Sequence, residues 1–197
     1  MIIDFTDRSP KDRYHLMTEV ITPRPVAWVV TEGIIEGEKI TNIAPFSYFT
    51  PISSAPPTVM ISIGHRPDGR PKDTLRNLRE SGKCTIAIVT PELLTPMHQS
   101  GQSLEAYESE LERFDIPSRP VLEGYPPMPK GIRAALFGTY FQEVDIQGSK
   151  TIPVIIQIDH LYLDEAIISD PETLTLSLSP IGRMGGTYRK LGEEVAP

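Results

Sequence analysis

The chain has 197 residues and a formal net charge of −7, and this length fits one domain, residues 1–197, with its own hydrophobic core. Because lysine and arginine are outnumbered by acids and never form a run, the composition argues against nucleic-acid binding, which depends on grouped basic side chains. No stretch approaches the roughly 18 consecutive apolar residues of a membrane span, and the first residues lack a signal-peptide core, so we expect neither membrane insertion nor export.

A short helix and a β-hairpin are predicted at the start of the chain. Residues 9–12 (Ser-Pro-Lys-Asp) combine an N-cap serine, a proline at the first helical position and an acid in the first turn. Apolar residues then recur at helical spacing to Ile21, so we expect the helix to end before Pro23. Residues 26–31 and 39–43 are rich in β-branched side chains and are separated by glycines, which predicts two strands joined by a hairpin.

The middle of the chain predicts a strand, a helix, a second strand and a longer helix. Residues 58–64 and 84–90 have strand character, and the segment 73–82 between them places leucines three apart and ends in Gly82, which can close a helix. Residues 91–114 are predicted to be helical, with Ser103 as an N-cap and an outer face composed mostly of glutamate. The apolar stripe of this helix consists of Leu104, Tyr107, Leu111 and Phe114.

Long apolar runs in the last third of the chain predict the closing strands of a barrel. Residues 132–146 and 154–164 are enriched in β-branched and aromatic side chains, and residues 174–178 alternate leucine with threonine and serine. Six or seven strands with only short helices favour a mainly β antiparallel barrel over a doubly wound sheet. No Gly-x-Gly-x-x-Gly follows a strand, so the sequence argues against a dinucleotide site of the Rossmann type.

Residues suited to thiol or metal chemistry are sparse. Cys84 is the single cysteine, which leaves no intrachain disulfide and is typical of a reducing, cytoplasmic compartment. Because Cys84 lies within an apolar strand pattern, we expect a buried, unreactive thiol. The four histidines stand far apart with no cysteine or carboxylate at ligand spacing, so the sequence predicts no metal site.

Two loops have the chemistry of a site for a flat, phosphorylated ligand. Residues 42–49 set small polar groups beside aromatic side chains, as a planar ligand with a polar edge requires. Residues 66–74 put Lys72 and Thr74 at a predicted helix N-terminus, where free N–H groups and the helix dipole favour an anion. Each loop also has a purely structural interpretation, as a proline loop that plugs the barrel end and as a solvated basic turn with an ordinary N-cap.

The chain resembles the flavin reductase-like, FMN-binding split-barrel family over roughly residues 16–188. Five segments occur in the family's order: Arg24-Pro-Val-Ala-Trp-Val-Val, Asn42-Ile-Ala-Pro-Phe-Ser-Tyr-Phe, Pro56-Pro-Thr-Val, Lys72-Asp-Thr-Leu-Arg-Asn-Leu and Ile181-Gly-Arg-Met-Gly-Gly-Thr-Tyr. The resemblance implies a six-stranded Greek-key split β-barrel with flanking short helices, paired into a homodimer with FMN at or near the subunit interface. It also implies reduction of flavin by NADH or NADPH, in some members for a flavin-dependent monooxygenase.

The resemblance assigns cofactor contacts to eleven positions. The 42–49 loop would line the isoalloxazine and ribityl chain, a serine and an arginine would face it from the next strand, residues 72–74 would hold the phosphate, and the C-terminal segment would approach from this chain or from the partner subunit. The positions are Asn42, Ala44, Phe46, Ser47, Ser62, Arg66, Lys72, Asp73, Thr74, Arg183 and Tyr188.

The chain departs from the family pattern at two places. Residues 68–71 are inserted before Lys72, which leaves the role of Arg66 open. The acidic helical segment 103–113 is the second departure, and it can reshape the nicotinamide entrance.

The expected reaction requires no side-chain acid or base. Hydride transfer from nicotinamide to flavin is the chemistry of the two cofactors, so the protein's part is to hold the rings together and to tune the flavin. Two alternatives stay open: an FMN-dependent electron carrier, oxidase or oxygenase acting on a small organic substrate, and a non-catalytic dimeric binding module. The choice between NADH and NADPH is also open.

Overall fold

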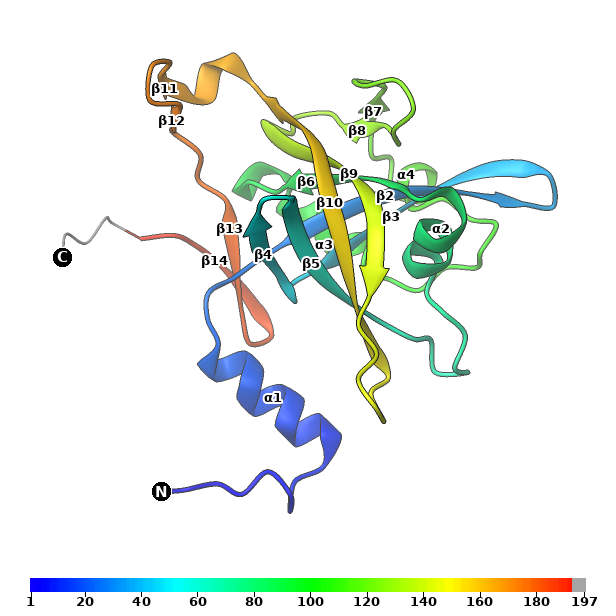
Figure 1. Ribbon diagram of the computed structural model, residues 1–197, viewed down its shortest axis with the longest axis vertical. Helices are drawn as coiled ribbons and strands as arrows, with labels where there is room; N and C mark the ends of the chain where they lie inside the picture. Colours follow the sequence, from blue (N-terminus) through cyan, green and yellow to red (C-terminus); the bar gives the residue numbers. More distant parts are fainter. Residues whose placement is uncertain (193–197) are drawn as a thin grey trace.

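The computed structural model describes residues 1–192, and seven antiparallel strands form its central sheet (Figure 1). The strands lie in the order β3-β2-β6-β9-β10-β5-β4. Their bounds are β2 (Ala27–Ile35), β3 (Glu38–Phe46), β4 (Phe49–Ser54), β5 (Pro57–Gly64), β6 (Lys83–Ile88), β9 (Ala134–Glu143) and β10 (Thr151–Leu163). The prediction of a mainly β chain is confirmed.

The two end strands of this sheet, β3 and β4, are consecutive in the chain and are joined only by Ser47 and Tyr48. The sheet curls until β3 approaches β5, and the Ser62 N–H donates a hydrogen bond to the Tyr48 carbonyl (2.9 Å) at this corner. No ladder pairs β3 with β4 within residues 1–192, so the sheet is open. The closed Greek-key barrel therefore stays a prediction.

The predicted hairpin is β2 and β3, which pair antiparallel from Ala27 opposite Phe46 to Ile35 opposite Glu38. Its two-residue turn, Glu36 and Gly37, has φ angles of 53° and 87°. Positive φ at both central residues is what a tight turn needs to match the right-handed twist of two strands. The predicted hairpin is therefore confirmed, although β2 continues through Gly33, which the sequence suggests as the start of the loop.

Within residues 1–192, four α-helices and two short 3₁₀ turns accompany the strands. The helix α1 (Pro10–Val20) begins at Ser9, whose hydroxyl accepts from the Asp12 N–H (3.2 Å), as the sequence predicts. The helix α2 (Asp73–Ser81) also follows its prediction, because Gly82 ends it with a φ of 70°. In Figure 1, α1 lies off the sheet, whereas α2 lies against the β2–β3 hairpin. The remaining pieces are η1 (Pro91–Leu93), α3 (Leu94–Gln99), α4 (Glu110–Arg113) and η2 (Glu165–Ile167).

Three small sheets carry the other strands of the described part of the chain. The prediction that residues 174–178 close a barrel is wrong, because only two of them pair, and they pair with β11 outside the central sheet. Leu174 and Leu176 are 64% and 38% exposed, so the alternation of leucine with polar residues has no buried face to stabilise a longer strand. One small sheet consists of β1 (Arg24–Pro25), β13 (Ile181–Met184) and β14 (Thr187–Lys190). A second pairs β11 (Ile168–Asp170) with β12 (Thr175–Leu176), and a third pairs β7 (Ser118–Arg119) with β8 (Met128–Pro129).

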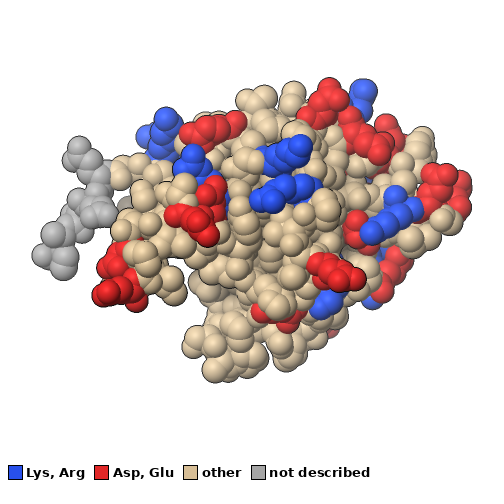
Figure 2. All heavy atoms as spheres, turned by 90° about the horizontal axis from the view of Figure 1, so that it is seen from above, with Lys and Arg blue, Asp and Glu red and all other residues tan. Residues whose placement is uncertain are grey.

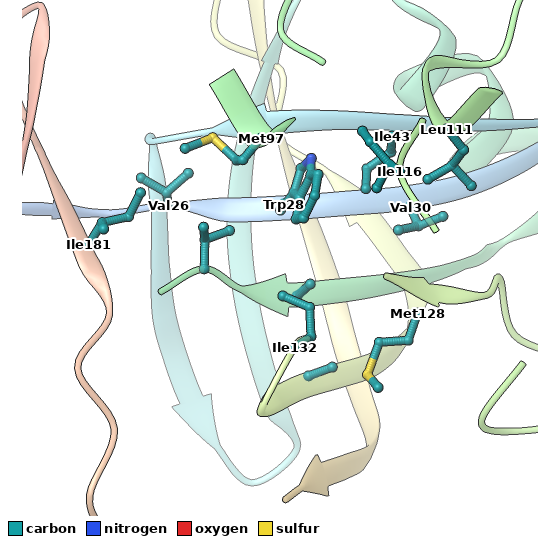
Figure 3. Packing of buried hydrophobic residues seen from close by; sticks show 13 residues of the cluster. Val26, Trp28, Val30, Ile43, Met97, Leu111, Ile116, Met128, Ile132 and Ile181 are labelled. Carbon is teal, nitrogen blue, oxygen red and sulfur yellow. The ribbon is translucent and has the colours of Figure 1, made fainter. Parts of the chain in front are cut away.

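Strand β2 is buried on both faces and separates two hydrophobic clusters. Alternate side chains point to opposite faces of a strand. Val29 packs with Leu78 of α2 in the cluster that we call the inner cluster. Trp28 points to the other face and belongs to the second cluster, which we call the outer cluster. Figure 3 shows Trp28 at the centre of the outer cluster, with Met97 and Ile132 nearby.

The single cysteine, Cys84, belongs to the inner cluster, and the expected buried thiol is confirmed. Its Sγ donates to the Gly138 carbonyl at 3.7 Å. Burial raises the pKa of Cys84 to about 12, so the thiol stays protonated at neutral pH.

The prediction of helix throughout residues 91–114 is wrong. Helices α3 and α4 flank an irregular segment, residues 100–109, which we call the strap. Tyr107 of the predicted apolar stripe is 66% exposed, so a helix here would not bury that stripe. Ser100 and Ser109 instead bond to groups of the β2–β3 hairpin, and such long-range contacts override local helix propensity.

Charged side chains of both signs are interspersed over the face seen in Figure 2, and part of that face carries none. Within residues 1–192, no helix is both long enough and apolar enough to cross a membrane.

Candidate functional site

Two adjoining cavities lie between β3, the start of α2 and the strap. The narrow cavity has a volume of about 60 Å³ and runs from β3 to the N-terminus of α2. The wide cavity, about 360 Å³, opens toward α1, α3 and the β13–β14 hairpin. Both cavities are lined by Pro45, Phe46, Gly101 and Gln102, so they form one elongated site.

The structure brings ten of the eleven predicted positions to this elongated site. The exception is Ser62 of β5, which lines a lateral cavity of about 380 Å³ with Tyr48; this cavity adjoins the wide cavity at Ser47. Three positions, Ser47, Arg183 and Tyr188, line the wide cavity, and Arg183 and Tyr188 reach it from the same chain. The narrow cavity is lined by Asn42, Ala44, Phe46, Arg66, Lys72, Asp73 and Thr74, with Phe46 shared.

The N-terminus of α2 forms one end of the narrow cavity. Lys72 is the N-cap residue, yet no side chain caps the helix, so its first N–H groups keep no side-chain partner. Lys72 itself is exposed and lines the narrow cavity. A cation and unfilled N–H groups at the positive end of a helix dipole form a favourable place for a phosphate.

Asp73 is held between two arginines and is not free to act alone. Its carboxylate pairs with the Arg66 guanidinium on one side and with Arg76 Nη1 (2.5 Å) on the other. Arg66 Nη2 also donates to the Leu104 carbonyl of the strap (3.0 Å). Because a carboxylate repels phosphate, Asp73 would contribute to an anion site by orienting the Arg66 guanidinium. Arg66 lines the narrow cavity, so the inserted residues 68–71 do not remove it from the site.

A buried polar network forms the floor of the narrow cavity. The Thr74 hydroxyl donates to Asn42 Oδ1 (2.9 Å), and Asn42 Nδ2 donates to Glu110 Oε2 (2.8 Å). The backbone N–H of Ile43 donates to the same Glu110 oxygen (3.0 Å). Thr74, Asn42 and Glu110 are 1%, 6% and 5% exposed, so each hydrogen bond forms where water cannot replace it.

Glu110 is the main site residue that sequence reasoning missed. Burial raises the pKa of its carboxyl group, although the donors Ile43 and Asn42 oppose that change. The sequence places Glu110 on the outer face of a predicted acidic helix, whereas α4 is a single turn whose first residue points into the protein. Its partners lie more than sixty residues earlier, so no local pattern could have identified it.

The strap is fixed at both ends and in its middle, so it acts as the outer wall of the site. At one end the buried Trp28 Nε1 donates to Ser100 Oγ (2.9 Å), and at the other the Ser109 hydroxyl donates to the Thr41 carbonyl (2.6 Å). In the middle, Arg66 holds the Leu104 carbonyl.

Aromatic and cationic groups line the wide cavity. The Arg183 guanidinium lies 4.3 Å from the ring centroid of Tyr188, and the Tyr188 hydroxyl lies 3.3 Å from His98 Nδ1. Tyr14 of α1 reaches the same cavity and stacks on Tyr48, with ring centroids 5.9 Å apart. Sequence reasoning missed Tyr14 and His98, because neither belongs to a motif.

The elongated site is therefore cationic at one end, hydrogen-bonding along its floor and aromatic at the other end. This combination suits a flat aromatic group joined by a polar chain to a phosphate. Within residues 1–192, no group of three or more histidine, cysteine, aspartate or glutamate side chains could hold a metal ion.

Comparison with known proteins agrees with this geometry. Residues 19–185 match the family described as "Flavin reductase like domain". An uncharacterized protein of Deinococcus radiodurans is 33% identical over 187 residues, which cover 93% of this chain and 82% of that protein.

Two solved structures share the fold. Nitrilotriacetate monooxygenase component B from Bacillus cereus superimposes with a TM-score of 0.90 and 25% identity, covering 100% of this chain and 98% of that one. A putative flavin reductase with a split-barrel domain from Shewanella frigidimarina superimposes with a TM-score of 0.80 and 19% identity, covering 100% and 98% of the two chains.

Proposed function

The chain belongs to the flavin reductase-like family, and from that premise we propose that it binds FMN and uses NADH or NADPH to reduce flavin. The observation that carries this proposal is the single elongated site, which joins a phosphate-binding end to an aromatic end. The similarity to a monooxygenase component B supports a role as supplier of reduced flavin to a monooxygenase.

The residues of the site fit FMN. The ammonium group of Lys72, the guanidinium of Arg66 and the open N-terminus of α2 would bind the phosphate. Asn42 and Gln102 lie between the two ends, where the ribityl hydroxyls need polar partners. The wide cavity has the volume and the aromatic lining for the fused rings.

The flavin, when bound, supplies the two-electron chemistry that accepts hydride from a nicotinamide. The chain itself binds and orients. Residues 44–47 border the ring end of the site, and a backbone N–H of Phe46 or Ser47 directed at the ring would stabilise negative charge better than mobile water does. The strap residues Gly101 and Gln102 border both cavities, so they would cover the ribityl chain of a bound flavin.

A homodimer belongs to the same proposal. Met17, Val20 and Ile21 of the α1 region are 38%, 81% and 57% exposed. They stand beside the apolar lateral cavity that Phe49 and Met60 line. A second copy covering this surface would remove a large apolar area from water.

The decisive experiment is an absorption titration of the purified protein with FMN, followed by anaerobic addition of NADH and of NADPH. We expect flavin to bind and its absorption near about 450 nm to bleach rapidly with one of the nucleotides. Bound flavin that stays oxidised would favour the electron carrier or oxidase. A protein that takes up no flavin would contradict the proposal and favour a binding module.

Lys72→Ala tests the phosphate end directly. A charge-assisted hydrogen bond contributes about 1.5–3 kcal/mol, so the Kd for FMN should rise roughly tenfold or more. Riboflavin, which has no phosphate, should lose nothing. Lys39→Ala, at the exposed end of the β2–β3 hairpin, is the matched control and should leave both affinities unchanged.

A further inference from the structure

The lateral cavity, with a volume of about 380 Å³, is lined mostly by apolar and aromatic side chains. Phe49 and Met60 come from the central sheet, Tyr48 from the link between β3 and β4, and Met17 from α1. The cavity adjoins the wide cavity at Ser47 but belongs to neither part of the elongated site. A concave, apolar site of this volume is typical of small-molecule binding.

Arg24 of β1 is the charged residue among the described residues that line this cavity. It is only 5% exposed. Its Nη1 makes both of its hydrogen bonds, to the carbonyl of Thr18 (2.6 Å) and to that of Ile21 (2.8 Å), at the C-terminal end of α1. These two bonds explain why the guanidinium lies there, because the end of a helix attracts a cation.

The other edge of the Arg24 guanidinium has no such explanation. Its Nε and Nη2 are both buried, and neither has a hydrogen-bond partner within residues 1–192. A buried donor without an acceptor costs free energy, and a charged donor costs more than a neutral one. An acceptor that reached this edge would therefore gain what the folded chain alone forgoes.

A second arginine of the chain shows which acceptor fits this edge. Arg79 binds the Glu143 carboxylate with its Nε (2.7 Å) and its Nη2 (2.8 Å), so the two bonds run side by side. The planar guanidinium matches a carboxylate in this bidentate way. Arg24 has the same pair of nitrogens available, and no carboxylate of residues 1–192 is bound to them.

The remaining lining of the cavity defines the rest of the ligand. Phe49, Tyr48 and Met60 present apolar surface, on which a ring packs well and a strongly hydrated body does not. The Arg24 edge is shielded from water, so a ligand reaches it only after a side chain at the cavity moves. Met17 is 38% exposed and has three rotatable bonds, so it can move at small cost.

An acidic side chain of a second copy is the other possible source of a carboxylate at this surface. Such a side chain would meet Arg24 but would fill only a small part of the cavity. A ring that carries a carboxylate would both fill the apolar volume and meet the Arg24 edge. The combination of volume, apolar lining and one buried cation therefore favours a small acid.

We propose that the lateral cavity binds a small apolar monocarboxylate, such as an aromatic acid, whose carboxylate pairs with Nε and Nη2 of Arg24. The inference goes beyond the proposed function and holds whether or not the elongated site binds flavin. Because Ser47 lines both cavities, the bound acid would lie beside the aromatic end of the elongated site.

The test is calorimetric titration of the purified protein with sodium benzoate and with benzamide, which has the same ring and a similar shape but no charge. Hydrogen bonds to a charged group are the stronger ones, so benzoate should bind about tenfold or more tightly than benzamide. Acetate keeps the carboxylate but lacks the ring, so it should bind more weakly than benzoate.

Arg24→Lys keeps the positive charge but cannot form two parallel N–H bonds. It should raise the Kd for benzoate about tenfold and leave the Kd for benzamide within about twofold. Arg79→Lys, which changes the same kind of bidentate edge outside the cavity, is the matched control and should change neither affinity. Met60→Trp fills the cavity without replacing Arg24, so it should abolish benzoate binding even if Arg24→Lys loosens α1.

Three results would overturn the inference. One is a wild-type protein that binds benzoate no more tightly than benzamide, or does not bind it. Another is loss of benzoate binding in Arg183→Ala with full binding in Arg24→Lys, because the acid would then occupy the wide cavity. The third is a wild-type dimer that binds no benzoate and becomes a monomer in Arg24→Lys, because a second copy would then supply the carboxylate.

Discussion

The two walls of the elongated site are held by different forces. The inner wall, β3 with α2, is regular structure that packs on the inner hydrophobic cluster through Leu75 and Leu78. The outer wall, the strap, is irregular and is attached by polar contacts at Ser100, Leu104 and Ser109. The hydrophobic effect is non-directional, so apolar side chains can pack on any apolar surface of matching shape. A hydrogen bond instead requires one donor and one acceptor at a defined distance and angle.

The difference shows how the site combines rigidity with specificity. The inner wall positions the N-terminus of α2 through packing of Leu75 and Leu78. The outer wall depends on single hydrogen bonds, each of which a substitution can remove. Substitutions in the two walls should therefore have separable effects on stability and on ligand affinity.

Leu78→Ala should give the largest loss of stability. Leu78 is fully buried near the C-terminal end of α2, and truncation of such a side chain costs about 2–5 kcal/mol. Flavin affinity of the folded fraction should change less than threefold, because the phosphate end lies at the opposite end of the helix. Urea unfolding monitored by Trp28 fluorescence and a flavin titration would measure the two effects. A large loss of affinity would show that the inner wall is not rigid.

Glu110→Ala should affect both properties. It leaves the Ile43 N–H and the Asn42 amide buried without an acceptor, at a cost of about 2–3 kcal/mol in unfolding free energy. Asn42 also loses its orientation, so the Kd for FMN should rise about tenfold. Glu112→Ala, an exposed acid on the same helical turn, is the control. Equal affinities in the two variants would exclude Glu110 from positioning the site.

Glu110→Gln isolates the effect of charge in the floor of the narrow cavity. The folded protein binds a proton at Glu110 more tightly than the unfolded chain does, because burial, assisted by nearby Asp73, raises its pKa above the usual 4.5. The contribution of Glu110 to the free energy of unfolding is therefore largest below pH 4.5. It is lost as the pH rises through the pKa of Glu110 in the folded protein. The unfolding free energy of wild type relative to Glu110→Gln should fall over that window and then level off. A difference independent of pH would contradict a buried, titrating carboxyl.

Arg79→Ala should give the smallest effect. Arg79 of α2 pairs with Glu143 of β9 (2.7 Å) at the exposed edge of the inner wall, and such pairs contribute roughly 0.2–1 kcal/mol. The loss should shrink further at high salt. A loss above about 2 kcal/mol would mean that the inner wall depends on charge more than on packing.

The inner wall could be predicted from the sequence, and the outer wall could not. The β2–β3 hairpin and α2 follow from β-branched runs, from Gly37 and from the closing Gly82, because their patterns repeat over neighbouring residues. The strap has an acidic, leucine-containing pattern that is typical of a helix. Its conformation is decided by Trp28 and Thr41, far away in the chain, so local propensity gives the wrong answer.

The candidate site divides in the same way. Motif resemblance located Lys72, Thr74 and Asn42, and the structure gathers them around one cavity. The resemblance could not reveal that the Asp73 carboxylate forms ion pairs with two arginines. Nor could it reveal that Glu110 forms part of the floor of the narrow cavity. Those facts depend on which side chains meet after folding. Ser62, which the resemblance assigns to the site from the next strand, lines the lateral cavity instead.

The burial of Cys84 has a practical consequence for work on this protein. Reduced flavin reacts with oxygen to give hydrogen peroxide, which attacks thiolates, and the single thiol of this chain is both protonated and enclosed. Under the proposed function, the protein should therefore tolerate the peroxide that flavin turnover would release in air. For the same reason, a cysteine introduced at Glu108 on the strap would be the sole reactive thiol, and a dye attached there would report movement of the outer wall without a cysteine-free background.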